Sequence, residues 1–276
     1  MSAAKIEEPG LKSMKTAAPE ESEQSASSPW VKLLYPAPFL FFLLIWHLST
    51  GHDPQKQFIF SSPEKVWLAL LRLIGSGELW TNSMVTIGEA LAGFLLGTTI
   101  GAVLGLALWY SRLVAQISRP YITALSAVPI FALAPIIISW FGIEITSKIM
   151  LAFLSTVSMA LVQSYQGAMS VEKRYLKLMQ VVGAARSQVF RLVVVPSSLI
   201  WVLNAMKINI GLALMGAFIG EFISSEQGLG CMIVKASALY DMATVFVGIF
   251  ALILIALVFT FIIEKLEKRL MAWKSI

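Results

Sequence analysis

The sequence predicts an all-α, polytopic membrane protein with about six transmembrane helices. Of its 276 residues, 57% are hydrophobic and 13% are charged, with a mean hydropathy of +0.78, whereas about a quarter of an average soluble domain is charged. Several apolar stretches exceed the roughly 18 residues that indicate a membrane-spanning helix. They lack the period-two alternation of a membrane β-barrel, so helices are expected.

The amino-terminal residues 1–29 mix Lys, Glu, Ser, Ala and Pro without an apolar run. This composition predicts a disordered cytoplasmic tail. The acidic residues Glu20, Glu21 and Glu23 argue against a signal peptide. We expect residues 30–276 to form one transmembrane domain, whose first span covers 33–48.

A short helix is expected after the first span, because Ser62, Pro63 and Glu64 form a typical helix start. Its apolar stripe predicts a helix lying on the outer membrane surface. The stripe comprises Val66, Trp67, Leu70, Leu71 and Ile74.

Five further spans are expected at 85–109, 122–140, 149–169, 196–222 and 245–263. The first of these carries a row of small residues, which favours close helix packing. The row comprises Gly88, Gly93, Gly97, Gly101 and Gly105. The next contains Pro129 and Pro135. Pro129 predicts either a simple kink or a break that turns backbone carbonyls toward a transport path.

The basic residues predict the orientation, because cytoplasmic loops are enriched in Lys and Arg. With the amino terminus inside, fifteen of the 21 Lys and Arg residues lie on the cytoplasmic side, and Lys207 lies within a span. The outer side holds Lys56, Lys65, Arg72, Lys148 and Lys235. Both termini are therefore expected in the cytoplasm. The charge of +5 follows from membrane topology and does not indicate nucleic-acid binding.

The long loop at about 170–196 is expected to carry the function. It reads as a helix with Tyr175, Leu178, Met179 and Val182 on one face, a turn at Gly183, and a second helix. A plain amphipathic interfacial helix is the alternative.

The residues of this loop resemble the coupling-loop signature of ABC-importer permeases. Gly183, Ala184 and Arg186 precede an apolar run that ends at Pro196, similar to the family pattern of Glu-Ala-Ala, three residues, Gly, an apolar stretch and Leu-Pro. The resemblance covers roughly 61–273 and fits the nitrate, sulfonate and taurine group best. Supporting matches are 62–67, 128–130, 140–143, 147–149, 220–222 and 228–230.

The resemblance implies a type I importer permease whose loop docks into a groove of a separate ATPase subunit. The residues at this coupling contact would be Lys177, Leu178, Met179, Val182, Gly183, Ala184 and Arg186. The chain departs from the family where Lys177, Leu178 and Met179 replace Glu-Ala-Ala. Contact there would rest on shape and on apolar side chains.

The chain contains no G-x-x-x-x-G-K-[ST] phosphate-binding motif. We therefore expect no catalysis and no cofactor in this chain, with ATP and Mg bound by a partner. The resemblance implies two ATPase subunits, a second permease copy as a homodimer, a periplasmic binding protein, and a bacterial inner-membrane location.

Lys207 lies eleven residues past Pro196, which places it about 16 Å into its helix, near the bilayer midplane. Structural pairing, a lining of an anion path, and snorkelling are the open alternatives. Asn204, Asn209, Glu89 and Pro129 are the other candidate path residues, and Glu89 is a possible partner of Lys207.

Glu221 lies at the outer end of the fifth span, and Gly228 and Gly230 follow it in a turn. They form either part of an outer mouth or an ordinary helix end and turn. The function predicted from the whole sequence is the permease subunit of an ATP-driven importer, with a small anion such as a sulfonate, taurine or nitrate as the family default. A secondary carrier coupled to an ion through Glu89 and Lys207 is the alternative. A membrane enzyme is disfavoured, because no intramembrane catalytic pair is present.

Overall fold

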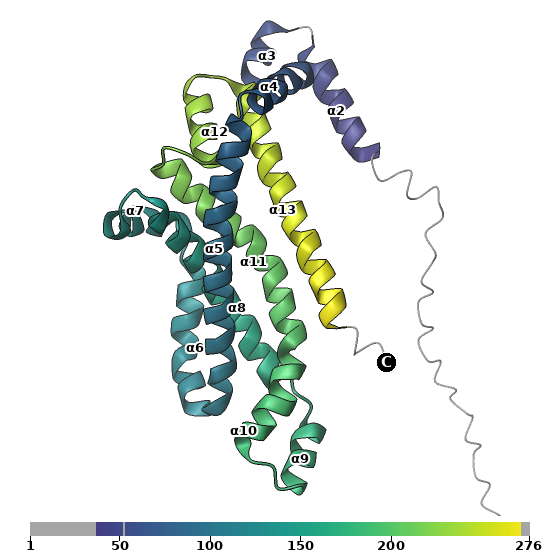
Figure 1. Cartoon of the computed structure of the whole chain (residues 1–276), viewed down its shortest axis with the longest axis vertical. Coiled ribbons are helices and arrows are strands. Elements are labelled where there is room, and N and C mark those ends of the chain that lie inside the picture. Colours follow the sequence, from purple (N-terminus) through teal and green to yellow (C-terminus); the bar gives the residue numbers. More distant parts are fainter. Residues whose placement is uncertain (1–36, 52, 272–276) are drawn as a thin grey trace, which may run out of the picture. The chain divides into compact units, whose positions relative to one another are not determined.

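The computed structural model describes residues 37–51 and 53–271, and all regular elements in that part of the chain are helices (Figure 1). The described residues fall into two compact units, which divide between Trp46 and His47. Helix α2 (Ala37–Thr50) contains the boundary. The predicted tail and residues 33–36 of the predicted first span lie outside the described residues, and α2 by itself is a short apolar helix.

Four helical segments of the described residues are long and apolar enough to cross a membrane. They are Glu78–Tyr110, which contains α5 (Glu78–Ala107), α8 (Ile145–Met169), Arg186–Ile223, which contains α11 (Val195–Ile223), and α13 (Met242–Leu270). A fifth is reached if the bent pair α6 (Arg112–Ala127) and α7 (Ile130–Phe141) is one span. The all-α expectation is confirmed.

The predicted third span is two helices that meet at an angle of 93°. Proline lacks an amide hydrogen and disfavours a helical conformation in the residue before it. Val128 accordingly has an extended backbone (φ −73°, ψ 124°), and Pro129 precedes the first residue of α7. The sequence located the interruption correctly, and the bend is much sharper than a simple kink.

Helices α5, α8 and α11 pack together as the core of the second unit (Figure 1). Their contact depends on small residues, because a Cβ added at Gly93 or Gly97 would meet backbone atoms of α8 within 3 Å. Gly101 and Gly105 make the same close approach. Gly88, however, has nothing within 4 Å of the added Cβ, so its assignment to the packing face was wrong.

Helices α3 (Pro54–Phe60) and α4 (Pro63–Gly75) follow α2. The Ser62 hydroxyl accepts a hydrogen bond from the Lys65 amide at 3.4 Å, as the predicted helix start requires. The buried face of α4 comprises Val66, Ala69 and Leu73. Trp67, Leu71 and Ile74, expected in the same apolar stripe, are exposed.

An ion pair joins α4 to the start of α13. The Arg72 guanidinium lies 3.1 Å from Asp241 Oδ2 and donates to Thr244 Oγ1 at 2.9 Å. Partial burial raises the pKa of Asp241, but hydrogen bonds from Thr244 and Arg72 outweigh burial and hold the pKa below its usual value.

This lowered pKa predicts a contact that weakens in acid. Because the folded-state pKa is depressed, the stabilisation is complete above the ordinary aspartate pKa of about 3.9 and is lost as the pH falls through the lowered value. Replacing Arg72 with Gln should move the Asp241 pKa upward. Carbon-13 NMR of labelled aspartate carboxyls across pH 2 to 6 measures it, and an unchanged Asp241 titration in Arg72→Gln would contradict the assignment.

Candidate functional site: a docking loop and a polar cavity

The predicted loop is a helix, a glycine turn and a second helix. Helix α9 (Lys173–Val181) is capped by Val182, and Gly183 adopts a left-handed backbone with φ of +69°. Helix α10 (Arg186–Val189) follows, and a π-helical turn (Phe190–Val194) joins it to α11. The expected helix–turn–helix is therefore confirmed.

The two faces of this loop differ. Met179 and Ala184 pack against a small core of Ala168, Val171, Val189 and Val194. Leu178, Val181 and Val182 point away from that core, with 59%, 84% and 66% of their surface exposed. Lys177 is also exposed. We call the exposed set Tyr175, Leu178, Val181 and Val182 the α9 apolar face.

Arg186 fixes the loop to the end of α5. Its guanidinium donates to the Tyr110 carbonyl oxygen at 2.6 Å and lies over the rings of Trp109 and Tyr110, at 5.4 and 5.8 Å from their centroids. Phe190 packs on the same two rings. Gln188 Oε1 accepts from the Ala185 amide at 2.8 Å. A movement of the loop would therefore act directly on a long core helix.

A polar cluster lies at the opposite end of α11, around the start of helix α12 (Leu229–Ala238). Glu221 accepts from the Thr86 hydroxyl and from the Gly230 amide, both at 2.6 Å. The Thr86 hydroxyl accepts from the Leu229 amide at 2.9 Å, and Asn82 Oδ1 accepts from the Gly228 amide at 2.8 Å. Side chains of α5 and α11 thus cap the amino-terminal amides of α12.

The two candidate glycines allow this close approach. A Cβ at Gly228 would overlap the Glu221 carboxyl group, and Gly228 also has φ of +106°. A Cβ at Gly230 would lie 2.8 Å from the Glu221 Cβ. The structure thus unites Glu221, Gly228 and Gly230.

Removing this cap should release α12. Glu221→Ala leaves the Gly230 amide without its acceptor, a loss of about 1–3 kcal/mol, while the Thr86 hydroxyl can still donate to the Asn82 carbonyl oxygen. Hydrogen exchange of the α12 amides should become faster while exchange in α8 stays unchanged. Glu226→Ala is the control, because Glu226 is exposed and caps nothing with its side chain. Equal exchange in both variants would contradict the capping role.

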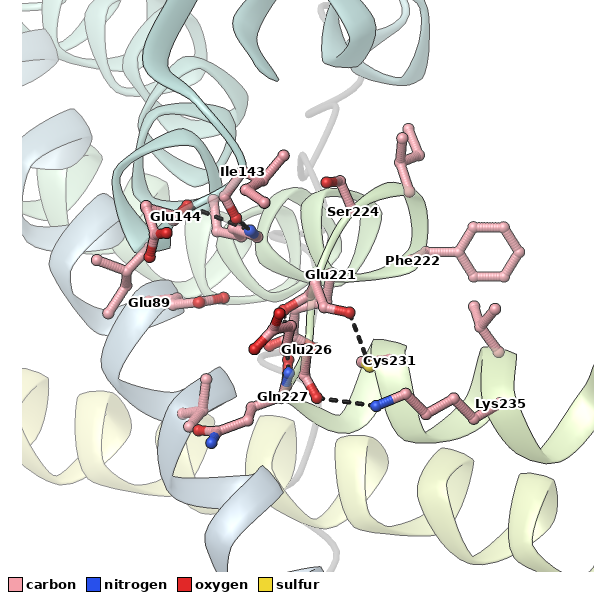
Figure 2. Close-up of a pocket in the computed structure, with 16 residues that line it drawn as sticks. Glu89, Ile143, Glu144, Glu221, Phe222, Ser224, Glu226, Gln227, Cys231 and Lys235 are labelled. Carbon is pink, nitrogen blue, oxygen red and sulfur yellow. Dashed lines mark hydrogen bonds between the residues drawn. The ribbon is translucent and has the colours of Figure 1, made fainter. Parts of the chain in front are cut away.

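A cavity of about 690 Å³ opens beside this cluster (Figure 2). Residues of α5, of the turn before α8, of the end of α11 and of α12 line it. Ionisable side chains on its wall are Glu89, Glu144, Lys148, Glu221, Glu226 and Lys235. Lys148 is 2% exposed and donates to the carbonyl oxygens of Ile143 and Glu144. In the described residues no group of three His, Cys, Asp or Glu could hold a metal ion.

Comparison with known proteins identifies the family. Residues 97–272, more than half of the chain, match the model of the binding-protein-dependent transport system inner membrane component. The chain belongs to this family of ABC transporter permeases. It is therefore a non-catalytic transport subunit of a system that depends on a binding protein.

Relatives of this permease differ in the solute that their names state. A riboflavin transport permease of Chloroflexus aurantiacus is 32% identical over 89% of this chain and 92% of its own. A formylaminopyrimidine transport permease of Halalkalibacterium halodurans is 31% identical over 86% and 96%. A taurine permease of Escherichia coli is 28% identical over 76% and 78%.

Solved structures support the fold of the permease. A chain of a methionine ABC transporter in an inward-facing conformation matches with a TM-score of 0.57 at 16% identity. The match covers 76% of this permease and 99% of that chain. The type I importer permease fold is therefore shown.

The permease does not bring its predicted path residues together. Lys207 Nζ lies 2.5 Å from Glu267 Oε2 of α13, so Glu89, its possible partner, is not the residue it pairs with, and Glu89 lines the cavity. Asn209 is buried, donating to Thr98 Oγ1 at 2.9 Å and to the Thr156 carbonyl at 3.2 Å.

The other two path candidates are also separate from the cavity. Asn204 is exposed on α11, and Pro129 lies at the bend between α6 and α7. Neither lines the cavity. A single translocation path through these five candidates remains a prediction.

Sequence reasoning missed several residues of both sites in the permease. Thr86 and Asn82 lie one and two turns before Glu89 on α5, and this spacing is the signal that could have found them. Lys148 was counted as a surface charge. Its place in the first turn of an apolar helix, Ile145–Met169, was the available hint.

Proposed function

We propose that this chain is the membrane-spanning permease subunit of an ATP-driven importer, and that the α9 apolar face docks into an ATPase subunit. The observation that carries the proposal is the contrast between the two faces of the loop. One face packs against α5 and α8. The other face leaves large apolar side chains exposed beside the turn at Gly183. Exposed apolar clusters of this kind are typical of protein interfaces.

We revise the roles of the residues predicted at the coupling contact. Leu178 and Val182 keep the role of direct contact, and Tyr175 and Val181 join them. The loop is held against the end of α5 by Met179, Ala184 and Arg186, which support the contact surface without belonging to it. Lys177 is exposed and contributes a charge at the rim.

The assembly that we propose has two ATPase subunits, two copies of this permease and an external binding protein, in a bacterial inner membrane. The α9 end faces the cytoplasm, as do both termini. The distribution of Lys and Arg supports this orientation, since Lys173, Arg174, Lys177, Arg186 and Arg191 all lie in or beside the loop. ATP and Mg are bound by the ATPase partner.

The solute is a small molecule delivered by the binding protein. The sulfonate, taurine or nitrate default rests on the family resemblance. Riboflavin and formylaminopyrimidine in the names of relatives widen the range beyond small anions.

Purification of the tagged chain from its native membrane tests the proposal. We expect an ATPase subunit to co-purify, and uptake to stop when the ATP site of that subunit is disabled. A secondary carrier, the alternative function, requires no such partner. Uptake that persists without ATP and collapses with the ion gradient would support the carrier and overturn the importer.

A further inference from the structure

The cavity beside α12 has a mixed lining, in which charged and polar side chains outnumber apolar ones. Val85, Ile143, Phe222, Ile223 and Val234 supply apolar surface. A volume of about 690 Å³ lies within the range of roughly 300–1,000 Å³ typical of small-molecule sites. The ionisable residues therefore decide which chemical class of molecule fits.

Both lysines of the cavity already have acceptors. Lys148 donates to the carbonyl oxygens of Ile143 and Glu144, and Lys235 donates to the Glu226 carbonyl oxygen at 2.9 Å. The Glu221 carboxyl group accepts from Thr86 and Gly230. These groups hold the wall of the cavity together, and the buried cation Lys148 is already engaged by two carbonyl oxygens, whereas Lys235 is exposed at the rim.

Glu89 differs from the other charged groups of the cavity. Its side chain is 2% exposed, its buried Oε2 atom accepts no hydrogen bond from an amide, amine or hydroxyl group of the described residues, and its carboxyl group lies beside that of Glu221. Figure 2 shows this side chain extending from α5 toward Glu221. Of the buried polar side-chain atoms that lack such a partner among the described residues, Glu89 Oε2 is the one whose residue lines this cavity.

A buried acceptor without a donor is costly, and a ligand that supplies the donor recovers that cost. We propose that this cavity is a solute-binding site in the permease itself, and that it takes a small organic molecule presenting an N–H donor, such as an ammonium, amidinium or amino-heterocycle, to the Glu89 carboxyl group. The apolar side chains of the lining, such as Val85, Phe222 and Val234, contact the body of that molecule. This inference rests on the proposed function, since it names the class of solute that the importer moves.

A pair of probes with the same planar shape tests the site. Benzamidinium carries N–H donors, and benzoate carries acceptors in their place. Both are titrated by calorimetry into the permease–ATPase complex in lipid nanodiscs at pH 7. We expect benzamidinium to bind at least roughly ten-fold more tightly than benzoate, because charge-assisted hydrogen bonds are the stronger ones.

The variants separate a binding role from a structural one. Glu89→Gln should reduce the preference for benzamidinium to below about two-fold, and Glu89→Asp, which keeps the carboxylate, should retain part of it. Glu78→Gln removes an exposed carboxylate from the start of α5, outside this cavity, and should leave the preference intact. Lack of a preference in the unmodified complex, or a full preference in Glu89→Gln, would overturn the inference.

The ATPase content of each preparation is measured before titration, so the two proposals fail separately. A chain that never assembles with an ATPase overturns the proposed function, and the probes can still be titrated against it. Normal assembly with ATPase and equal binding of the two probes overturns the solute site alone.

Discussion

Gly97→Ala should destabilise the folded permease by about 2 kcal/mol, within the range measured for overpacked protein interiors. The added Cβ would overlap the Thr156 hydroxyl group and lie 2.7 Å from the Phe153 carbonyl oxygen. Helix α5 would have to move away from α8. That movement also stretches the bonds from Asn209 on α11 to Thr98 and to the Thr156 carbonyl.

Gly88→Ala is the matched control for this experiment. Gly88 lies on the same helix, and nothing lies within 4 Å of an added Cβ. The substitution should leave stability unchanged or raise it by up to about 1 kcal/mol, because alanine is the better helix former. Unfolding in mixed micelles, followed by circular dichroism, gives both values. Equal stability of the two variants would show that the α5–α8 contact is not set by small residues.

Leu178→Asp combined with Val181→Asp should abolish ATPase docking without unfolding the permease. Both side chains are more than half exposed, at 59% and 84%, so the change removes little from the core. Central residues of an interface each cost about 2 kcal/mol or more on truncation. Two of them should weaken binding by well over ten-fold.

The control for docking is Leu239→Asp, an equally exposed leucine that follows α12 at the other end of the bundle. It should leave the ATPase bound. The measurement is the ratio of ATPase to permease after purification in detergent. If the Leu239 variant lost the ATPase and the double variant kept it, the ATPase would dock at the α12 end of the bundle, which contradicts the proposal.

The sequence predicted the features that depend on neighbouring residues. The Gly183 turn and its two helices follow from local periodicity and from the one residue that adopts φ of +69° without strain. Ser62 and Pro63 fix the start of α4 in the same way. Pro129 located the interruption of the third span, because proline acts on its own backbone and on the residue before it.

The sequence did not predict contacts between distant helices. The Lys207–Glu267 pair joins residues sixty positions apart, and its register is set by how α11 packs on α13. Helix α13 also runs to Leu270, past the predicted end of its span at 263. Glu267 therefore lies on this helix, where it can pair with Lys207. The 93° bend depends likewise on packing, because the proline allows many angles.

The polar cluster at α12 was predicted only in outline. The family resemblance singled out Glu221, Gly228 and Gly230. It did not show that the glutamate packs against the two glycines and caps a helix. A glutamate packed against two glycines indicates a cap only after α12 is known to start there. The helix has ten residues and no apolar period strong enough to separate it from a loop.

A cysteine cross-link tests directly whether the ATPase docks at the α9 apolar face. Val181→Cys is introduced with Cys231→Ser, which removes the native buried cysteine, and the ATPase subunit is cross-linked through a cysteine in its groove. Docking of the ATPase at the α9 apolar face predicts a cross-linked permease–ATPase band for Val181→Cys whose yield changes when ATP is added, and none for Leu239→Cys. A band from Leu239→Cys with none from Val181→Cys would contradict it.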